Sequence, residues 1–124
     1  MTLRKRNYLT EGANDSYSTY LRDADAAFLK EVAKGIKRVA GDHAESVEVK
    51  SGISTAWISY KGQDKGDIDL TFIAHLVPVG DFNVKLYWEY DSAMSRDQKN
   101  EKTYKIGVMT PEVIINIFKQ IFGD

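Results

Sequence analysis

The chain has 124 residues, which is enough for one domain with a hydrophobic core of its own. Its hydrophobic fraction of 43% and charged fraction of 28% are those of an ordinary globular domain, and its net charge of −1 argues against general electrostatic capture of nucleic acid. The absence of cysteine excludes disulfides, thiolate metal sites and a cysteine nucleophile. Because no apolar run approaches the roughly 20 residues of a membrane span, we expect a cytoplasmic protein without a membrane partner.

The N-terminal segment differs in pattern from the rest of the chain. A basic cluster, Arg4-Lys5-Arg6, is followed by Leu9-Thr10-Glu11-Gly12-Ala13. Such a short charged leader resembles the head-targeting peptide of internal proteins of T-even-type tailed phages, which a maturation protease cuts after a Leu/Ile-x-Glu triplet. The resemblance implies cleavage after Glu11 and a phage-encoded protein, packaged in the virion interior or acting in the host cytoplasm, whereas an ordinary frayed N-terminus implies neither. We therefore expect a flexible leader over residues 1–14 and a single domain over residues 15–124.

The first expected element is a helix over residues 16–40. Its apolar residues recur at steps of three and four, the period of a helix that buries one face. Basic side chains gather at its C-terminal end, where they suit the helix dipole, and Gly41 is expected to end it. The predicted buried stripe consists of Tyr17, Tyr20, Leu21, Ala24, Phe28, Val32, Ile36 and Val39.

From Ser46 onward the period changes to two, which is typical of strands with one buried face. Even-numbered apolar residues are expected to face the core from Ile68 to Leu76 and again from Phe82 to Tyr90. Stretches rich in glycine or charge are expected to form the connections between strands. In chain order we predict a short strand around Val47 and Val49, strands over residues 54–60, 67–77, 82–90 and 103–108, turns over 61–66 and 78–81, and a mobile loop over 91–102.

A second helix follows, with sequence signals at both of its ends. Thr110 is predicted to cap it, Pro111 suits its first position, and Gly123 is expected to end it. The order helix, four to five antiparallel strands, helix predicts a two-layer α+β fold with both helices on one face of the meander. The apolar face of this last helix consists of Val113, Ile114, Ile117, Phe118, Ile121 and Phe122.

The opposite face of the sheet is the predicted working surface. An outward Trp57 and Tyr87 set among charged and polar side chains are typical of a binding surface, because aromatic anchors with polar neighbours are enriched at interfaces. The alternatives are cross-strand packing, burial under the loop over 91–102, and a one-residue shift that turns Trp57 inward. The candidate binding residues are Trp57, Asp69, His75, Lys85, Tyr87 and Glu89.

The expected hairpin between the third and fourth strands also sets two carboxylates opposite one another. It places Asp69 near Glu89, and His75 near Asn83 or Lys85. Like charges across a ladder are destabilising, so we expect a neutralising partner for the two acids. A nearby lysine is one such partner, and a divalent cation is the other.

The cation would be held by Asp67, Asp69 and Glu89, an all-oxygen set that suits magnesium or manganese. Residues 66–70 (Gly-Asp-Ile-Asp-Leu) resemble the Asp-x-Asp strand of nucleotidyltransferases, which bind two metals and a nucleoside triphosphate. That family also has a Gly-Ser pair before a helix, whereas residues 51–54 (Ser-Gly-Ile-Ser) have a different order and precede a strand pattern. The resemblance implies a metal-dependent nucleotidyl- or phosphoryl-transfer enzyme.

Other catalytic patterns do not assemble in the sequence. It contains no Gly-x-Ser-x-Gly elbow, no phosphate loop and no dinucleotide fingerprint. We therefore expect a small non-enzymatic binding protein that needs no cofactor and engages a protein partner or a second copy of itself, without nucleic acid. The alternatives are the metal-dependent transferase and a structural subunit of an oligomer.

Overall fold

The computed structural model describes residues 13–51, 55–92 and 98–123. The expected cleavage position at Glu11 lies outside these residues. The first helix begins at Ala13, three residues before the predicted start, so it includes the last two residues assigned to the leader. Within the part of the chain that the structure describes, neither helix combines the length and apolarity needed to cross a bilayer.

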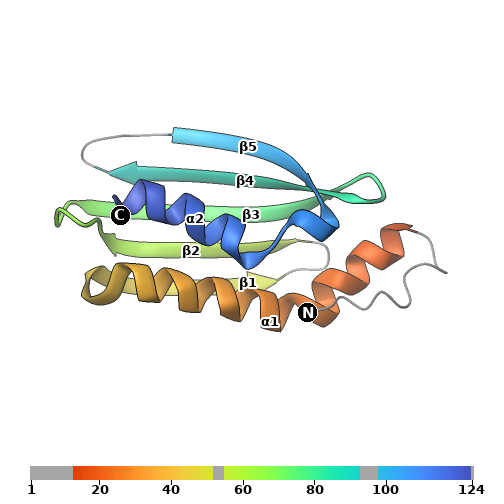
Figure 1. The fold of residues 1–124 in the computed structure, drawn as a ribbon, viewed down its shortest axis with the longest axis horizontal. Helices are drawn as coiled ribbons and strands as arrows, with labels where there is room; N and C mark the ends of the chain where they lie inside the picture. The colour runs from red at the N-terminus through yellow and green to blue at the C-terminus, as the bar shows by residue number, and fades with distance from the viewer. Residues whose placement is uncertain (1–12, 52–54, 93–97, 124) are drawn as a thin grey trace.

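The five strands form one antiparallel sheet in which every strand pairs with its neighbours in the sequence (Figure 1). This arrangement confirms the predicted meander and leaves the first and last strands at the two edges. The strands are β1 Ala44–Ser51, β2 Ala56–Gln63, β3 Asp69–Val79, β4 Asn83–Ser92 and β5 Gln98–Lys105.

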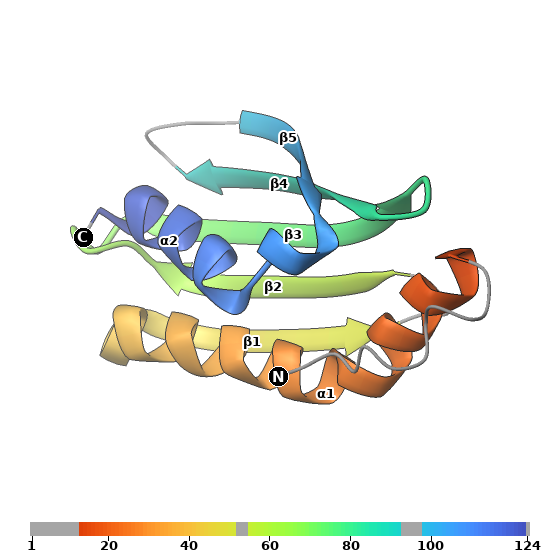
Figure 2. The same cartoon turned by 45° about the vertical axis from the view of Figure 1, so that its right-hand side comes forward.

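Both helices lie on one face of this sheet (Figures 1 and 2). Helix α1, Ala13–Ala40, packs against β1 and β2, and helix α2, Pro111–Phe122, lies beside α1 and reaches β3. Two short 3-10 segments, η2 Gly41–His43 and η3 Ile106–Val108, connect the helices to the sheet edges. The fold is therefore the two-layer α+β arrangement expected from the periodicity.

The core lies between the helices and the inner face of the sheet. Phe118 of α2 is fully buried there, and its ring lies edge-on to those of Tyr60 and Phe72. Val32 and Ile36 of α1 are also fully buried, as their spacing predicts. The remaining buried residues include Leu29, Ala40, Ala56, Ile58, Leu70, Ala74, Leu76, Val84, Leu86, Met109, Ile114, Ile115 and Phe122.

The ends of α2 follow the predicted pattern in most respects. Pro111 is its first residue, and Gly123 follows its last with φ of 100°, a left-handed conformation that glycine adopts at little cost. Thr110 occupies the N-cap position with extended backbone, but its side chain makes no capping hydrogen bond. The helix start therefore depends on Pro111 and on packing, without the capping bond expected of Thr110.

A glycine inside α1 sets the distance between the two helices. A Cβ placed on Gly35 would lie 2.6 Å from Cγ1 of Ile115 in α2, well inside van der Waals contact. Glycine in a helix interior costs stability relative to alanine. Gly35 is therefore explained by the close approach of α2.

Three sequence predictions about the strands are wrong. Residues 91–102 were expected to form a loop, yet β4 continues to Ser92 and β5 begins at Gln98, while residues 106–108 form η3 instead of strand. Phe82 was expected to face the core, but it lies in the turn between β3 and β4 and is 68% exposed. Backbone pairing with β4 creates β5 although its sequence shows no apolar alternation.

Candidate binding face of the sheet

The outer face of the sheet is formed by the side chains that point away from both helices. Phe72 and Ala74 of β3 point inward and are fully buried, whereas Ile73 between them is 41% exposed. Trp57 of β2 is 37% exposed and lies opposite His75 of β3, on this same face. The strand register therefore turns Trp57 outward, as the sequence predicts.

Three aromatic side chains of the outer face form a continuous stack across β2, β3 and β4. The ring of His75 lies between its cross-strand partners, 6.2 Å from that of Trp57 and 4.9 Å from that of Tyr87, centroid to centroid. The planes are inclined by 27° and 12°, so the rings are nearly parallel. Stacked rings cover one another's faces and present mainly their edges to solvent.

Charged residues continue the aromatic row to both edges of the sheet. Lys50 of β1 lies opposite Trp57, and Glu101 of β5 lies opposite Tyr87. Nζ of Lys85 lies 3.8 Å from the Glu101 carboxylate and 5.7 Å from the Tyr87 ring centroid. Lys85 thus forms both an ion pair with Glu101 and a cation–π contact with Tyr87, at the end of the stack nearest β5.

A second row runs beside the first, two residues along each strand. It consists of Glu48, Ser59, Ile73, Glu89 and Lys99, from β1 to β5 in order. Between the two rows, over β3 to β5, lies an open hollow of about 180 Å³. Its walls are mainly apolar and aromatic, and they are formed by Ile73, His75, Tyr87, Trp88, Glu89, Lys99 and Asn100.

The predicted pairing of β3 with β4 is wrong. Glu89 lies opposite Ile73, and His75 lies opposite Tyr87, not Asn83 or Lys85. Strand β3 runs through Pro78 to Val79, so the turn consists of residues 80–82 and not of residues 78–81. Because the turn comes later in the chain than predicted, every residue pair between β3 and β4 is shifted relative to the predicted register.

The observed register separates the carboxylates of the expected metal site. Asp69 pairs with Gln63 of β2, while its neighbour Leu70 lies opposite Ser92, three residues beyond Glu89. In the described residues, no group of three or more histidine or acidic side chains could hold a metal ion. The predicted pairing of Asp69 with Glu89, on which the expected metal site depended, is therefore wrong.

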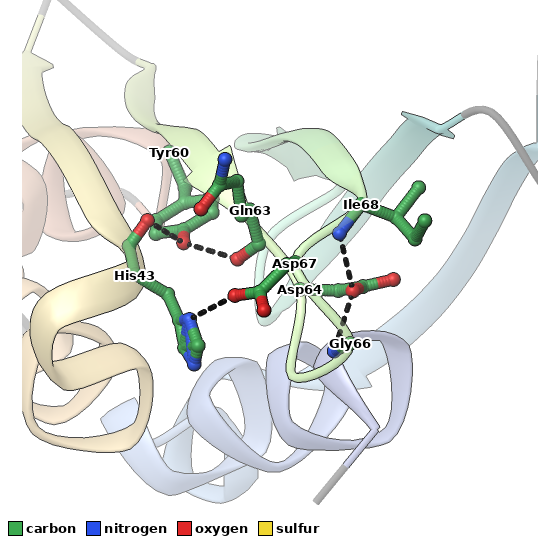
Figure 3. A network of polar contacts seen from close by, with 7 residues as sticks. All are labelled: His43, Tyr60, Gln63, Asp64, Gly66, Asp67 and Ile68. Carbon is green, nitrogen blue, oxygen red and sulfur yellow. Dashed lines mark hydrogen bonds and ion pairs between the residues drawn. The ribbon is translucent and has the colours of Figure 1, made fainter.

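Asp67, the third expected ligand, takes part in a different polar cluster at the turn between β2 and β3 (Figure 3). Its Oδ1 lies 3.6 Å from Nδ1 of His43, which follows α1. Nearby, the Tyr60 hydroxyl donates to the Gln63 carbonyl at 2.8 Å and lies 3.2 Å from the His43 carbonyl. These contacts join the short segment after α1 to the hairpin between β2 and β3.

The turn itself is shaped by Asp64. Its carboxylate accepts hydrogen bonds from the backbone N–H groups of Gly66 at 2.8 Å and Ile68 at 3.0 Å. Asp67 has φ of 66°, a left-handed conformation that aspartate tolerates better than most side chains. Residues 64–68 therefore form a structural turn, in which the Asp67 carboxylate lies beside His43, whereas Asp69 is the first residue of β3.

Tyr60 links this cluster to the pH dependence of stability. Burial raises the pKa of the Tyr60 hydroxyl above its ordinary value near 10, and the negative charge of Asp64 raises it further. A raised pKa in the folded state means that stability is fully present below pH about 10 and falls as the pH rises through the folded value. We expect Tyr60→Phe to lose about 1 kcal/mol at pH 7, with its hydrogen bond, and to resist alkaline unfolding better.

Urea unfolding between pH 8 and 11 measures this difference. Tyr104 is the matched control, because burial alone raises the pKa of its hydroxyl and it belongs to β5. The Tyr104→Phe variant should still lose, at alkaline pH, the part of the free energy of unfolding that depends on the ionisation of Tyr60. An unchanged pH slope in Tyr60→Phe would contradict the assignment.

The outer face contains functional candidates that the sequence did not indicate. Lys99 and Glu101 fall in the stretch expected to be a loop, and Lys50 lies at the end of a strand with few apolar residues. Of the predicted residues, Trp57, His75, Lys85, Tyr87 and Glu89 share the outer face. Asp69 lies outward at the far end of β3, away from the stack.

The fold and this face together define a two-layer α+β domain in which the two described helices cover one face of the sheet and leave the other uncovered. Comparisons of the chain with protein-family models, with curated proteins and with solved structures found no significant match. The geometry of the outer face is therefore the guide to the function of the protein.

Proposed function

We propose that the protein is a non-enzymatic binding protein whose outer sheet face docks against a protein surface. The observation that carries this proposal is the Trp57–His75–Tyr87 stack, which stays partly exposed beside Ile73 and an apolar hollow. Aromatic side chains are enriched in binding hot spots, and a rim of charged residues is typical of protein interfaces.

The ring geometry favours a protein partner over nucleic acid. Proteins that bind single-stranded nucleic acid stack bases on exposed aromatic faces within a basic groove. Here the faces of His75 are occupied by its neighbours, and Lys85 lies over Tyr87. Lysines and glutamates alternate around the stack, so the face has no concentrated positive charge.

Cross-strand packing explains part of the stack, because each ring stabilises the pairing of its strands. It does not explain why Trp57 and Ile73 remain about two-fifths exposed on a face that no helix or strand of the described residues covers. An exposed apolar patch rimmed by polar residues is typical of an interaction site. The proposal does not depend on the leader or on cleavage after Glu11.

Trp57→Ala tests the proposal. We expect the variant to fold with a loss well below the roughly 3–5 kcal/mol of truncating a buried aromatic, because the indole is partly in solvent. We also expect the protein partners captured by wild type from its natural source to be lost. Phe82→Ala is the matched control, since that ring is exposed but lies in the β3–β4 turn.

Quantitative mass spectrometry of the captured proteins and urea unfolding of each variant give the two readouts. A Trp57→Ala variant that no longer folds would place the indole in the core and contradict the proposal. So would equal losses of captured partners in Trp57→Ala and Phe82→Ala.

A further inference from the structure

We infer that the outer face binds a second copy of this chain, packed face to face about a two-fold axis parallel to β3. This inference rests on the proposed function, since it names the partner of the same face. It follows from the charges at the two edges of the sheet, which are opposite in sign within each cross-strand row, and from the placement of the aromatic residues.

The charges change sign from one edge of the sheet to the other within each row. In the aromatic row, Lys50 stands on β1 and Glu101 on β5. In the second row the signs are reversed, with Glu48 on β1 and Lys99 on β5. All four side chains are exposed, and within the described part of the chain neither Lys50 nor Lys99 forms an ion pair.

A two-fold axis along the central strand exchanges β1 with β5 and β2 with β4. It therefore sets Lys50 of one copy over Glu101 of the other, and Glu48 over Lys99. Every such contact occurs twice in an isologous dimer. The same operation brings Lys61 of β2 over Asp91 of β4, which share a third row through their pairing with Thr71.

The apolar side chains match under the same operation. Ile73 meets its own copy at the axis, and Trp57 is placed over Tyr87 beside the hollow of the other chain. An apolar cavity of about 150 Å³ can hold a benzene ring, so a hollow of about 180 Å³ suits an aromatic side chain. Each copy would thus supply one indole and one hollow.

A two-fold axis running across the strands gives a poorer fit. Placed between the two rows, it would still oppose Lys50 with Glu48, but it sets Trp57 over Ser59 and Tyr87 over Glu89. That arrangement sets the Glu89 carboxylate on the Tyr87 ring, whereas the axis along β3 sets it over the Ser59 hydroxyl of the other copy, which can donate a hydrogen bond to it. The axis along β3 satisfies charge and apolar contacts together.

Charge reversal distinguishes the arrangement by sedimentation and native mass spectrometry of the full chain. Wild type is expected at twice the chain mass of 14.0 kDa. Lys50→Glu alone and Glu101→Lys alone each create two like-charge contacts, so each should raise the dimer Kd about tenfold or more. An equimolar mixture of the two variants should form the heterodimer, because both of its contacts again join opposite charges.

The matched controls are Lys34→Glu and Glu31→Lys, which reverse exposed charges on α1, away from the outer face. They should leave the dimer Kd unchanged. A concentration-independent monomer of wild type overturns the inference, and so does a dimer whose two reversed variants do not recover on mixing. The proposed function is judged separately: a monomer whose captured partners are lost in Trp57→Ala would still support it.

Discussion

Replacing Gly35 by leucine is expected to destabilise the protein by about 3 kcal/mol, a large part of the total for a domain of this size. The leucine side chain would enter a contact where even a Cβ comes within 2.6 Å of Cγ1 of Ile115. Because Ile115 is buried and β-branched, relief requires either an unfavourable rotamer or separation of α1 from α2. Urea unfolding at constant m-value measures the cost.

The compensating variant shows whether the helix contact is the cause. In the background of Ile115→Ala, the further change Gly35→Ala should cost much less than it does alone, because the clashing atoms are gone. Lys37→Leu is the control for placing a leucine in the same helix, since Lys37 is exposed. An equal cost for Gly35→Ala with and without Ile115 would show that helix packing does not account for the glycine.

Phe118→Ala should have the largest effect among single truncations, about 3–5 kcal/mol. The side chain is fully buried, and its ring centroid lies 4.8 Å from that of Tyr60, 5.6 Å from Phe72 and 5.6 Å from Phe122. Its removal leaves a cavity between α2 and the sheet and deletes three aromatic contacts at once. The polar cluster around the Tyr60 hydroxyl would lose support on the same side.

The controls for this truncation separate burial from ring chemistry. Phe118→Leu keeps most of the volume and should cost clearly less than alanine. Phe82→Ala, which removes a ring that is 68% exposed, should stay within about 0.5 kcal/mol of wild type. A small loss for Phe118→Ala, comparable to that of Phe82→Ala, would contradict the description of the core.

The two sides of the sheet are expected to have different roles: the side covered by the helices provides stability, and the outer face provides association. Substitutions at Gly35 and Phe118 act on the inner layer, where the helices cover the sheet, and should lower stability. Substitutions at Trp57, Lys50 and Glu101 act on the outer face and should change association with much smaller effects on unfolding. Parallel measurement of unfolding and of association in all of these variants separates the two purposes.

The sequence determined the fold class and the direction of most side chains. Periods of 3.6 and 2 predicted both helices and four of the strands, and alternation placed Trp57, His75 and Tyr87 on one face. These features are local, because a residue's neighbours along the chain decide which side of a helix or strand it occupies. Pro111 and Gly123 marked the last helix for the same reason.

The tertiary structure decided the register and the bounds of β5. Pro78 and Gly80 suggested an earlier turn, but continued pairing with β4 carries β3 to Val79 and so moves Glu89 away from Asp69. A fifth strand was predicted over residues 103–108, but β5 runs from Gln98 to Lys105. Its first part is polar and shows no apolar period, because it lies at a sheet edge and buries little, so pairing with β4 decides where the strand begins. The charges that Lys99 and Glu101 of β5 contribute to the outer face therefore could not be predicted from the sequence. Their positions depend on the strand register, which is decided by contacts between distant residues.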